Sequence, residues 1–120
     1  AEPTMEQKLT IDPYTNVHKD MPPVFLWHSA TDTSVNALCA LTFAQKLFET
    51  GVSVELHLFA GGVHGCALAD KVSASAASHY DEGCEQWTNL LQIWLKRILT
   101  EDSKEKREKE EQHGKEKQDE

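Results

Sequence analysis

The spacing of hydrophobic residues changes several times along the chain, and each spacing predicts an element. Residues 24–28 are a short, mostly apolar run that stops at small polar residues, a pattern typical of a strand buried on both faces. Two prolines precede this run, where missing amide donors cost little. Apolar and polar residues alternate over 52–59, which predicts a second strand with one less buried face.

Two further segments have apolar residues at helical spacing. Residues 37–50 predict a helix that Ser34 or Asn36 can cap and that Gly51 ends as a left-handed C-cap. Residues 83–99 predict a last helix, capped by Asp81. The order strand, helix, strand, helix predicts an α/β fold whose parallel strands are joined by a right-handed crossover.

The chain therefore divides into three parts. Residues 1–21 are expected to be an irregular lead-in, and residues 22–99 to form the folded α/β part. In residues 100–120 the apolar spacing stops and Lys alternates with Glu. This charged tail is predicted to be either a solvent-exposed extension of the last helix or disordered.

Composition narrows the classes of function. A chain of 120 residues is enough for one domain. The net charge of -8 and the pI near 5.2 argue against binding to nucleic acid or to anionic membranes, which need a basic surface. No apolar run approaches the ~20 residues of a membrane helix. The three cysteines, Cys39, Cys66 and Cys84, show no paired spacing, so we expect reduced thiols and a cytoplasmic location.

Two residues could carry chemistry together. Asp32 follows the first predicted strand and His64 follows the second. If the strands are parallel neighbours, both loops emerge at the same edge of the sheet. A carboxylate there can fix the tautomer of an imidazole, whose other nitrogen is then free to take a proton from a nucleophile. The alternative is that Asp32 is an ordinary turn residue and that His64 is a surface or core histidine.

Several motifs occur in an order that resembles a known family. They are PPVFLWHSATDTSV at 22–35, FAQKL at 43–47, GVSVELH at 51–57, GGVHG at 61–65, Trp87, and IWLKR at 93–97. Over residues 21–99 the chain is similar to the C-terminal portion of α/β-hydrolase-fold esterases of the acetyl-xylan and feruloyl esterase type, near dienelactone hydrolase and prolyl oligopeptidase relatives. The resemblance implies that Asp32 is the triad acid, that His64 is the base and that His28 has a supporting role. It implies no cofactor and no metal.

The chain also departs from that family. Asn36 stands where relatives commonly have proline, and the sequence contains no Gly-x-Ser-x-Gly nucleophile elbow. The triad order on this fold places the serine before the acid, yet residues 1–21 contain no serine, and Ser29 and Ser34 lack flanking glycines. The oxyanion-hole loop is missing as well.

We therefore expect this chain to be the C-terminal piece of a serine-type carboxylic ester hydrolase, with little or no esterase activity by itself. The parent protein would act on small acetyl or related esters of carbohydrates, with the missing N-terminal hydrolase portion as a partner. Two alternatives stay open: a non-catalytic, hydrolase-like interaction module and a serine peptidase relative. Because two strands and two helices leave apolar surface uncovered, self-association is also expected.

The remaining candidates have ordinary interpretations. Cys66 could pair with the histidine as a nucleophile but is expected to be a packing residue, and Cys39 to be packed or partly exposed. Metal binding is not favoured, because His57 lies in the middle of a strand, away from the loops. Tryptophans at strand and helix-face spacings are expected in the core rather than in a sugar-stacking platform. The tryptophans are Trp27, Trp87 and Trp94. Two further residues, His79 and Tyr80, could line an active-site rim.

Overall fold

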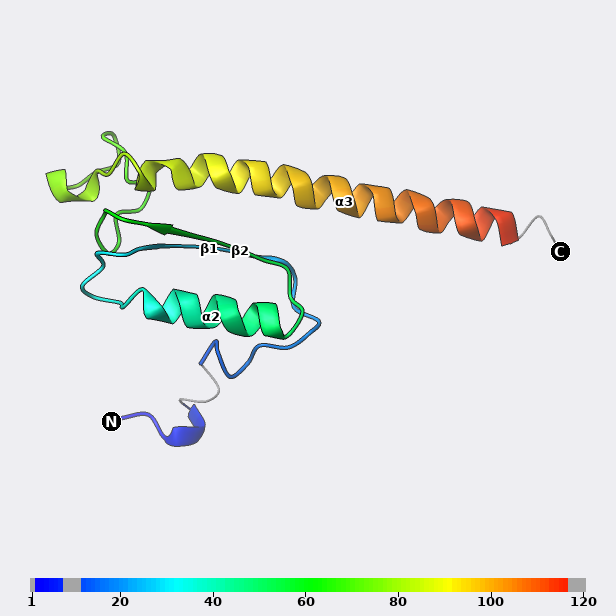
Figure 1. The fold of residues 1–120 in the computed structure, drawn as a ribbon, viewed down its shortest axis with the longest axis horizontal. Helices are drawn as coiled ribbons and strands as arrows, with labels where there is room; N and C mark the ends of the chain where they lie inside the picture. Colours follow the sequence, from blue (N-terminus) through cyan, green and yellow to red (C-terminus); the bar gives the residue numbers. More distant parts are fainter. Residues whose placement is uncertain (1, 8–11, 117–120) are drawn as a thin grey trace. The chain divides into compact units, whose positions relative to one another are not determined.

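A computed structural model describes residues 2–7 and 12–116. It contains β1 (Val24–Ser29), α2 (Leu38–Glu49), β2 (Val54–Phe59), two short 3-10 turns and the long helix α3 (Trp87–Glu116). Figure 1 labels the strands β1 and β2 and the helices α2 and α3. The chain divides into two compact units, residues 1–88 and residues 89–120.

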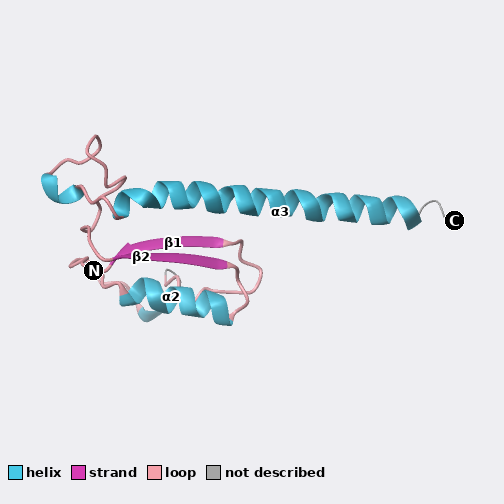
Figure 2. Cartoon of the chain, turned by 45° about the horizontal axis from the view of Figure 1, so that its top comes forward, coloured by secondary structure: helices cyan, strands magenta, loops and turns pink. Residues whose placement is uncertain are grey.

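The first unit is built on a parallel pair of strands. β1 pairs with β2 in a register that runs from Val24 opposite Val54 to Ser29 opposite Phe59. Helix α2 connects the strands and contacts both of them from one face, as Figure 2 shows. The predicted parallel strand-helix-strand unit is confirmed, and its topology brings the carboxyl ends of both strands to the same edge.

Local chemistry sets the ends of α2. The side-chain oxygen of Asn36 accepts a hydrogen bond from the Leu38 amide at 2.9 Å, which caps the first turn. Gly51 has a φ of +82°, a left-handed conformation in which glycine carries no steric cost. The Val52 amide then donates to the Leu47 carbonyl at 2.9 Å. Because that amide closes the helix, β2 begins two residues later than the alternation predicts.

A small core lies beyond the carboxyl ends of the strands. Cys66, Ala69 and Cys84 are buried there, and Trp27, Phe59 and Val63 pack against them. The Trp27 and Trp87 rings stack with their centroids 5.4 Å apart. The indole nitrogen of Trp87 donates to the Ala67 carbonyl at 3.0 Å. Trp27 thus packs against the core as predicted. Trp87 is half-buried and stacks on Trp27, where it fixes the loop that follows His64.

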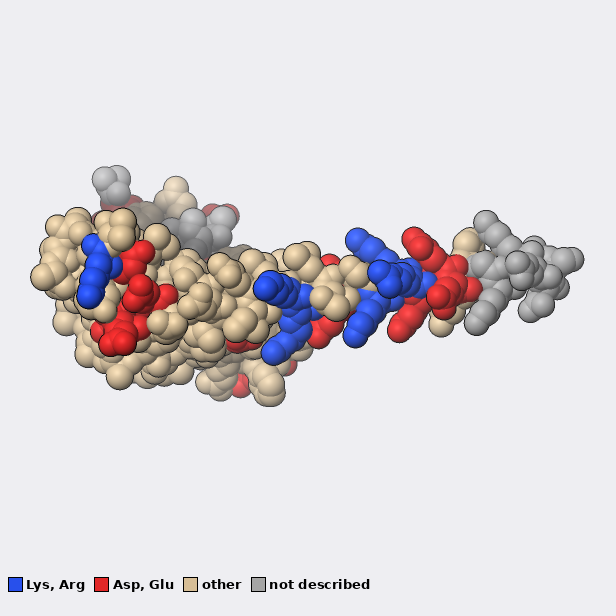
Figure 3. All heavy atoms as spheres, turned by 90° about the horizontal axis from the view of Figure 1, so that it is seen from above, with Lys and Arg blue, Asp and Glu red and all other residues tan. Residues whose placement is uncertain are grey.

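The last helix differs from its predicted bounds at both ends. Its start is a 3-10 turn at Cys84–Gln86, capped by a hydrogen bond of 2.8 Å from the Cys84 amide to the Asp81 carboxylate. Its end lies at Glu116, so residues 100–116 of the predicted tail are helical. Figure 3 shows acidic and basic side chains interspersed along this part. Within the described ranges, no helix is long and apolar enough to cross a membrane.

The lead-in contains one feature that the sequence pattern did not predict. Residues 5–7 are helical, and Thr4 and Gln7 cap this turn by exchanging side-chain to amide hydrogen bonds of 2.8 and 3.2 Å. Residue 1 and residues 8–11 of the predicted lead-in, and residues 117–120 of the predicted tail, lie outside the described residues.

Candidate active site

Asp32 is held in a tight loop just after β1. Its amide donates to the Ser29 carbonyl at 3.2 Å. One carboxylate oxygen, Oδ1, accepts hydrogen bonds of 2.8 Å from the amides of both Ser34 and Val35. The side chain is only 5% exposed. Asp32 is therefore a turn residue by its Oδ1 contacts, and this leaves its second oxygen available for another partner.

That second partner is His64. Its Nδ1 lies 2.9 Å from Asp32 Oδ2. Because an ionised carboxylate can only accept, Nδ1 carries a proton, and in the neutral ring Nε2 then carries the lone pair. Within the described part of the chain, Nε2 has no hydrogen-bond partner, and the His64 side chain is 53% exposed. The ring borders a small hollow of about 180 Å³ together with Trp27, Val63 and Gly65. The predicted juxtaposition of Asp32 and His64 is thus present in the structure.

His28 supports the acid loop from the end of β1. Its Nε2 lies 2.9 Å from the Val35 carbonyl oxygen and 3.5 Å from Asp32 Oδ2. A carbonyl cannot donate, so Nε2 of His28 carries a proton and donates it. The side chain is 16% exposed. These contacts fit the supporting role that the resemblance implies, because they fix the far end of the Asp32 loop.

The electrostatics keep Asp32 ionised. The amide hydrogen bond from Val35 lowers the pKa of the Asp32 carboxyl, and burial opposes that shift. Hydrogen bonds from His64 and from the Ser34 amide lower it further, so that the pKa falls from 3.8 to about 2. At neutral pH the side chain is a carboxylate, the form that both orients an imidazole and stabilises its protonated state.

The loop that carries His64 requires a glycine at its turn. Gly62 has a φ of +92°, a conformation that side chains rarely adopt. A Cβ at this position would lie 2.5 Å from Cys84 Sγ, so the backbone passes directly over the buried thiol. This close approach seats the loop on the core two residues before His64.

Two residues of the site were missed by sequence reasoning. Ser29 and Thr31 join the acid loop to the His64 loop through hydrogen bonds to the carbonyls of Gly61 and Gly62. The sequence signal that could have indicated them is the pair of hydroxyl residues on either side of Ala30, at the end of the first strand.

The cysteines do not form a nucleophilic site. Cys66 is 3% exposed, which confirms its packing role, whereas Cys39 is exposed on α2. Burial is the main cause, and the nearby Asp81 the second, of a rise in the pKa of the Cys84 thiol to about 12. A thiol that stays protonated at neutral pH is a poor nucleophile.

His57, which the sequence places away from the loops, lies apart from the Asp32–His64 pair. His57 Nε2 bonds to Glu55 at 2.8 Å within β2, away from the loops that hold Asp32 and His64. Among the residues that the structure describes, no three His, Cys, Asp or Glu side chains are grouped so as to hold a metal ion.

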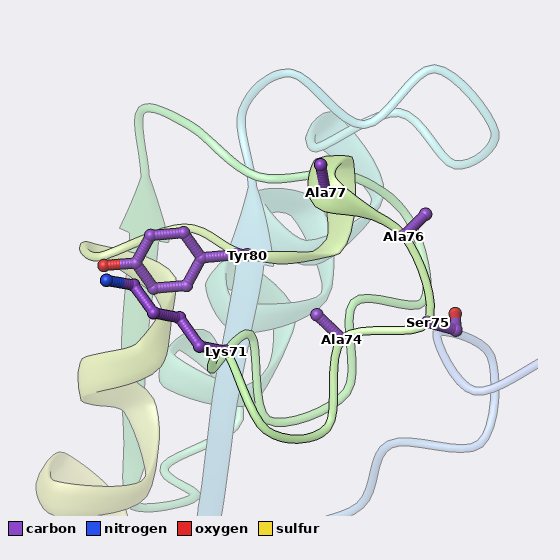
Figure 4. A pocket seen from close by; sticks show the side chains of 6 residues that line it. All are labelled: Lys71, Ala74, Ser75, Ala76, Ala77 and Tyr80. Atoms are coloured by element: carbon purple, nitrogen blue, oxygen red, sulfur yellow. The ribbon is translucent and has the colours of Figure 1, made fainter.

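A separate hollow of about 450 Å³ lies in the loop between β2 and α3. Figure 4 shows Lys71 and Tyr80 side by side along its wall, and the Lys71 ammonium lies 5.2 Å from the centroid of the Tyr80 ring. His79 Nδ1 lies 2.9 Å from the Ser75 hydroxyl. Tyr80 therefore lines this separate hollow and not the one beside His64, and His79 is held within its own loop.

Comparison with known proteins shows what this chain as a whole is similar to. A family profile described as the prolyl oligopeptidase family matches residues 2–101. A carboxylesterase from Lactobacillus plantarum is 31% identical, with a TM-score of 0.65 over 68% of this chain and 30% of that protein. An acetyl ester-xyloside bifunctional hydrolase from Caldicellulosiruptor lactoaceticus is 33% identical, with a TM-score of 0.68 over 82% of this chain and 33% of that protein.

A third solved structure is an α/β hydrolase from a deep-sea metagenome. It is 29% identical, with a TM-score of 0.66 over 70% of this chain and 35% of that protein. The chain thus spans about a third of the length of these three proteins. No match was found among curated proteins.

Proposed function

This chain belongs to the prolyl oligopeptidase family and carries part of an α/β-hydrolase fold, and on that premise we propose that Asp32 and His64 are the acid and the base of a serine-type carboxylic ester hydrolase. The single observation that carries the proposal is the 2.9 Å contact between Asp32 Oδ2 and His64 Nδ1. It leaves Nε2 as a proton acceptor. The nucleophilic serine comes from outside these 120 residues, since the sequence has no Gly-x-Ser-x-Gly segment.

The proposed reaction proceeds in two steps. His64 Nε2 takes the proton of the serine hydroxyl as the serine oxygen attacks the ester carbonyl. The proton then passes from Nε2 to the departing alcohol, and an acyl-enzyme remains. Water repeats the attack with His64 again as base, which releases the acid and restores the serine. Asp32 stays ionised throughout and stabilises the imidazolium each time it forms.

The proposed substrates are acetyl or related esters of carbohydrates. This choice is supported by two solved relatives, a carboxylesterase and an acetyl ester-xyloside bifunctional hydrolase. A second candidate reaction is peptide-bond hydrolysis, which the name of the matching family favours. The same acid and base serve both reactions, because amides and esters share the acyl-transfer mechanism.

A chimeric enzyme tests the proposal. The segment of the Lactobacillus plantarum carboxylesterase that aligns with this chain is replaced by the chain itself, and hydrolysis of 4-nitrophenyl acetate and of a peptide 4-nitroanilide is measured. We expect ester hydrolysis that His64→Ala abolishes. The matched control is His18→Ala, since His18 is an exposed histidine in the lead-in, and it should leave the rate unchanged.

Two results would count against the proposal. One is an active chimera whose rate is insensitive to His64→Ala. The other is turnover of 4-nitrophenyl acetate by the isolated 120-residue chain that His64→Ala abolishes, because this would place the nucleophile within the chain. Hydrolysis of the anilide but not of the ester would favour the peptidase alternative.

A further inference from the structure

Two side-chain hydroxyls join the loops that carry Asp32 and His64. Ser29 Oγ lies 2.6 Å from the Gly61 carbonyl oxygen, and Thr31 Oγ1 lies 2.7 Å from the Gly62 carbonyl oxygen. The partners are 32 and 31 residues apart in the sequence. We call these two hydrogen bonds the hydroxyl clamp. It connects the residues just before Asp32 to the residues just before His64.

The direction of both hydrogen bonds follows from the available protons. Carbonyl oxygens only accept, so each hydroxyl must donate its single proton to its carbonyl. The Ser29 and Thr31 oxygens are also 3.1 Å apart, but with both protons committed this contact is not a donor–acceptor pair. The Thr31 amide instead donates to Ser29 Oγ at 3.3 Å. The clamp therefore has one consistent arrangement of protons.

The clamp is anchored in the interior at one end. Ser29 is 4% exposed and therefore buried. The Gly61 carbonyl also accepts a hydrogen bond of 3.3 Å from Cys84 Sγ. Next to the clamp, the Ala30 amide donates to the Phe59 carbonyl at 2.7 Å and extends the strand ladder by one bond. Water has little access to Ser29, so its hydrogen bond is costly to lose.

His64 itself has few contacts that could hold it in place. Its side chain is half exposed, and its hydrogen bond is the one to Asp32. A single hydrogen bond at a half-exposed position holds a side chain only weakly, because water competes for both partners. By contrast, the carbonyls of Gly61 and Gly62, three and two residues before the histidine, are each fixed by one hydroxyl.

We propose that Ser29 and Thr31 are positioning residues, whose hydroxyls hold the backbone of the His64 loop at the separation that the Asp32–His64 hydrogen bond requires. The proposal rests on the proposed function for its catalytic meaning, although the positioning itself can be measured without catalysis. When the clamp is removed, the histidine ring samples positions beyond reach of Asp32. Its two neutral tautomers then become more nearly equal in population, and Nε2 is less often the free acceptor.

The test uses the full 120-residue chain labelled with ¹⁵N-histidine, and nuclear magnetic resonance measures the ratio of the two His64 tautomers. Thr31→Val keeps the shape of the side chain and removes the hydroxyl, and Ser29→Ala removes the buried hydroxyl. The matched control is Thr42→Val, because the Thr42 hydroxyl donates to the Leu38 carbonyl at 2.5 Å within α2. The rescue variant is Thr31→Ser, which restores a hydroxyl at the clamp.

We expect the Nδ1–H tautomer to dominate in the unmodified chain. Thr31→Val should lower its ratio to the Nε2–H tautomer by about fivefold, the effect of one lost hydrogen bond. Thr42→Val should leave the ratio unchanged and Thr31→Ser should restore it. Thr31 is exposed, so its variant keeps the fold even where Ser29→Ala disturbs it.

Three results overturn the proposal: no tautomer preference in the unmodified chain, an unchanged ratio in Thr31→Val, or an equal fall in Thr42→Val. The proposed function fails separately, through an active chimera that does not depend on His64. If the chimera is active without His64 and the clamp still controls the His64 tautomer, the clamp positions the histidine but has no catalytic role.

Discussion

Replacing Asp32 by asparagine separates the shape of the acid loop from its charge. The asparagine carbonyl oxygen can still accept the two amide hydrogen bonds, each 2.8 Å long, that Ser34 and Val35 make to Oδ1. The oxygen that faces His64 at 2.9 Å, however, becomes an NH₂ group, which only donates. His64 must then accept through Nδ1, so its proton moves to Nε2. The base loses its outward lone pair although the loop keeps its conformation.

The magnitude follows from this inversion of the tautomer. In the chimeric esterase, kcat for 4-nitrophenyl acetate should fall by about 10,000-fold, the loss known for a triad whose acid becomes an amide. KM should change little, because the substrate is bound elsewhere. In the isolated chain, the ¹⁵N shifts of His64 should change from the Nδ1–H to the Nε2–H pattern.

The assay has a built-in control. Asp12→Asn alters another aspartate whose carboxylate accepts a backbone amide, that of Tyr14 at 3.0 Å, and it should leave both rate and tautomer unchanged. If Asp32→Asn keeps the Nδ1–H tautomer and the full rate while the circular dichroism spectrum stays the same, the charge of Asp32 does not set the tautomer of His64.

Three further outcomes follow from the same contacts. Gly62→Ala should reduce the free energy of unfolding, measured in urea, by about 2–4 kcal/mol, because it adds left-handed strain and a clash with the core. Gly65→Ala should cost only about 1 kcal/mol, because Gly65 has a φ of +69° but open space where the new Cβ would lie. The fold lowers the pKa of the Asp32 carboxyl from 3.8 to about 2. The ionised Asp32 therefore stabilises the fold fully above pH ~4, and this stabilisation is lost as the pH falls toward 2. Unfolding measured across this pH range should show the loss, and Asp32→Asn should abolish this pH dependence. Leu47 is fully buried, so Leu47→Ala should lower the free energy of unfolding by about 2–5 kcal/mol. A smaller decrease in a urea titration would count against the burial of Leu47.

The central pair could be predicted because it depends on topology. A short apolar strand, an amphipathic helix and a second strand imply a parallel unit, and parallel strands end at the same edge. Asp32 and His64 follow the two strands, so their proximity needed no knowledge of side-chain conformations. The same local rules predicted the caps of α2 at Asn36 and Gly51, because cap chemistry is read from one or two residues.

Other features depended on contacts that a linear pattern does not contain. The hydroxyls of Ser29 and Thr31 find carbonyl partners 32 and 31 residues away, and only the folded register aligns them. The continuation of α3 to Glu116 is favoured by the helix propensity of Lys and Glu, but without apolar spacing the pattern could not distinguish a helix from disorder. Self-association stays a prediction; Phe48, 78% exposed on α2, is the type of residue that would promote it.

If Asp32 and His64 act as one unit, a double-mutant cycle in the chimeric esterase will show it. Values of kcat/KM for 4-nitrophenyl acetate are compared for the unmodified chimera, Asp32→Asn, His64→Ala and the double variant. Members of a catalytic unit are strongly non-additive, so the double variant should be no slower than His64→Ala alone. If the two losses multiply instead, Asp32 and His64 act independently, and the proposed acid–base pair is contradicted.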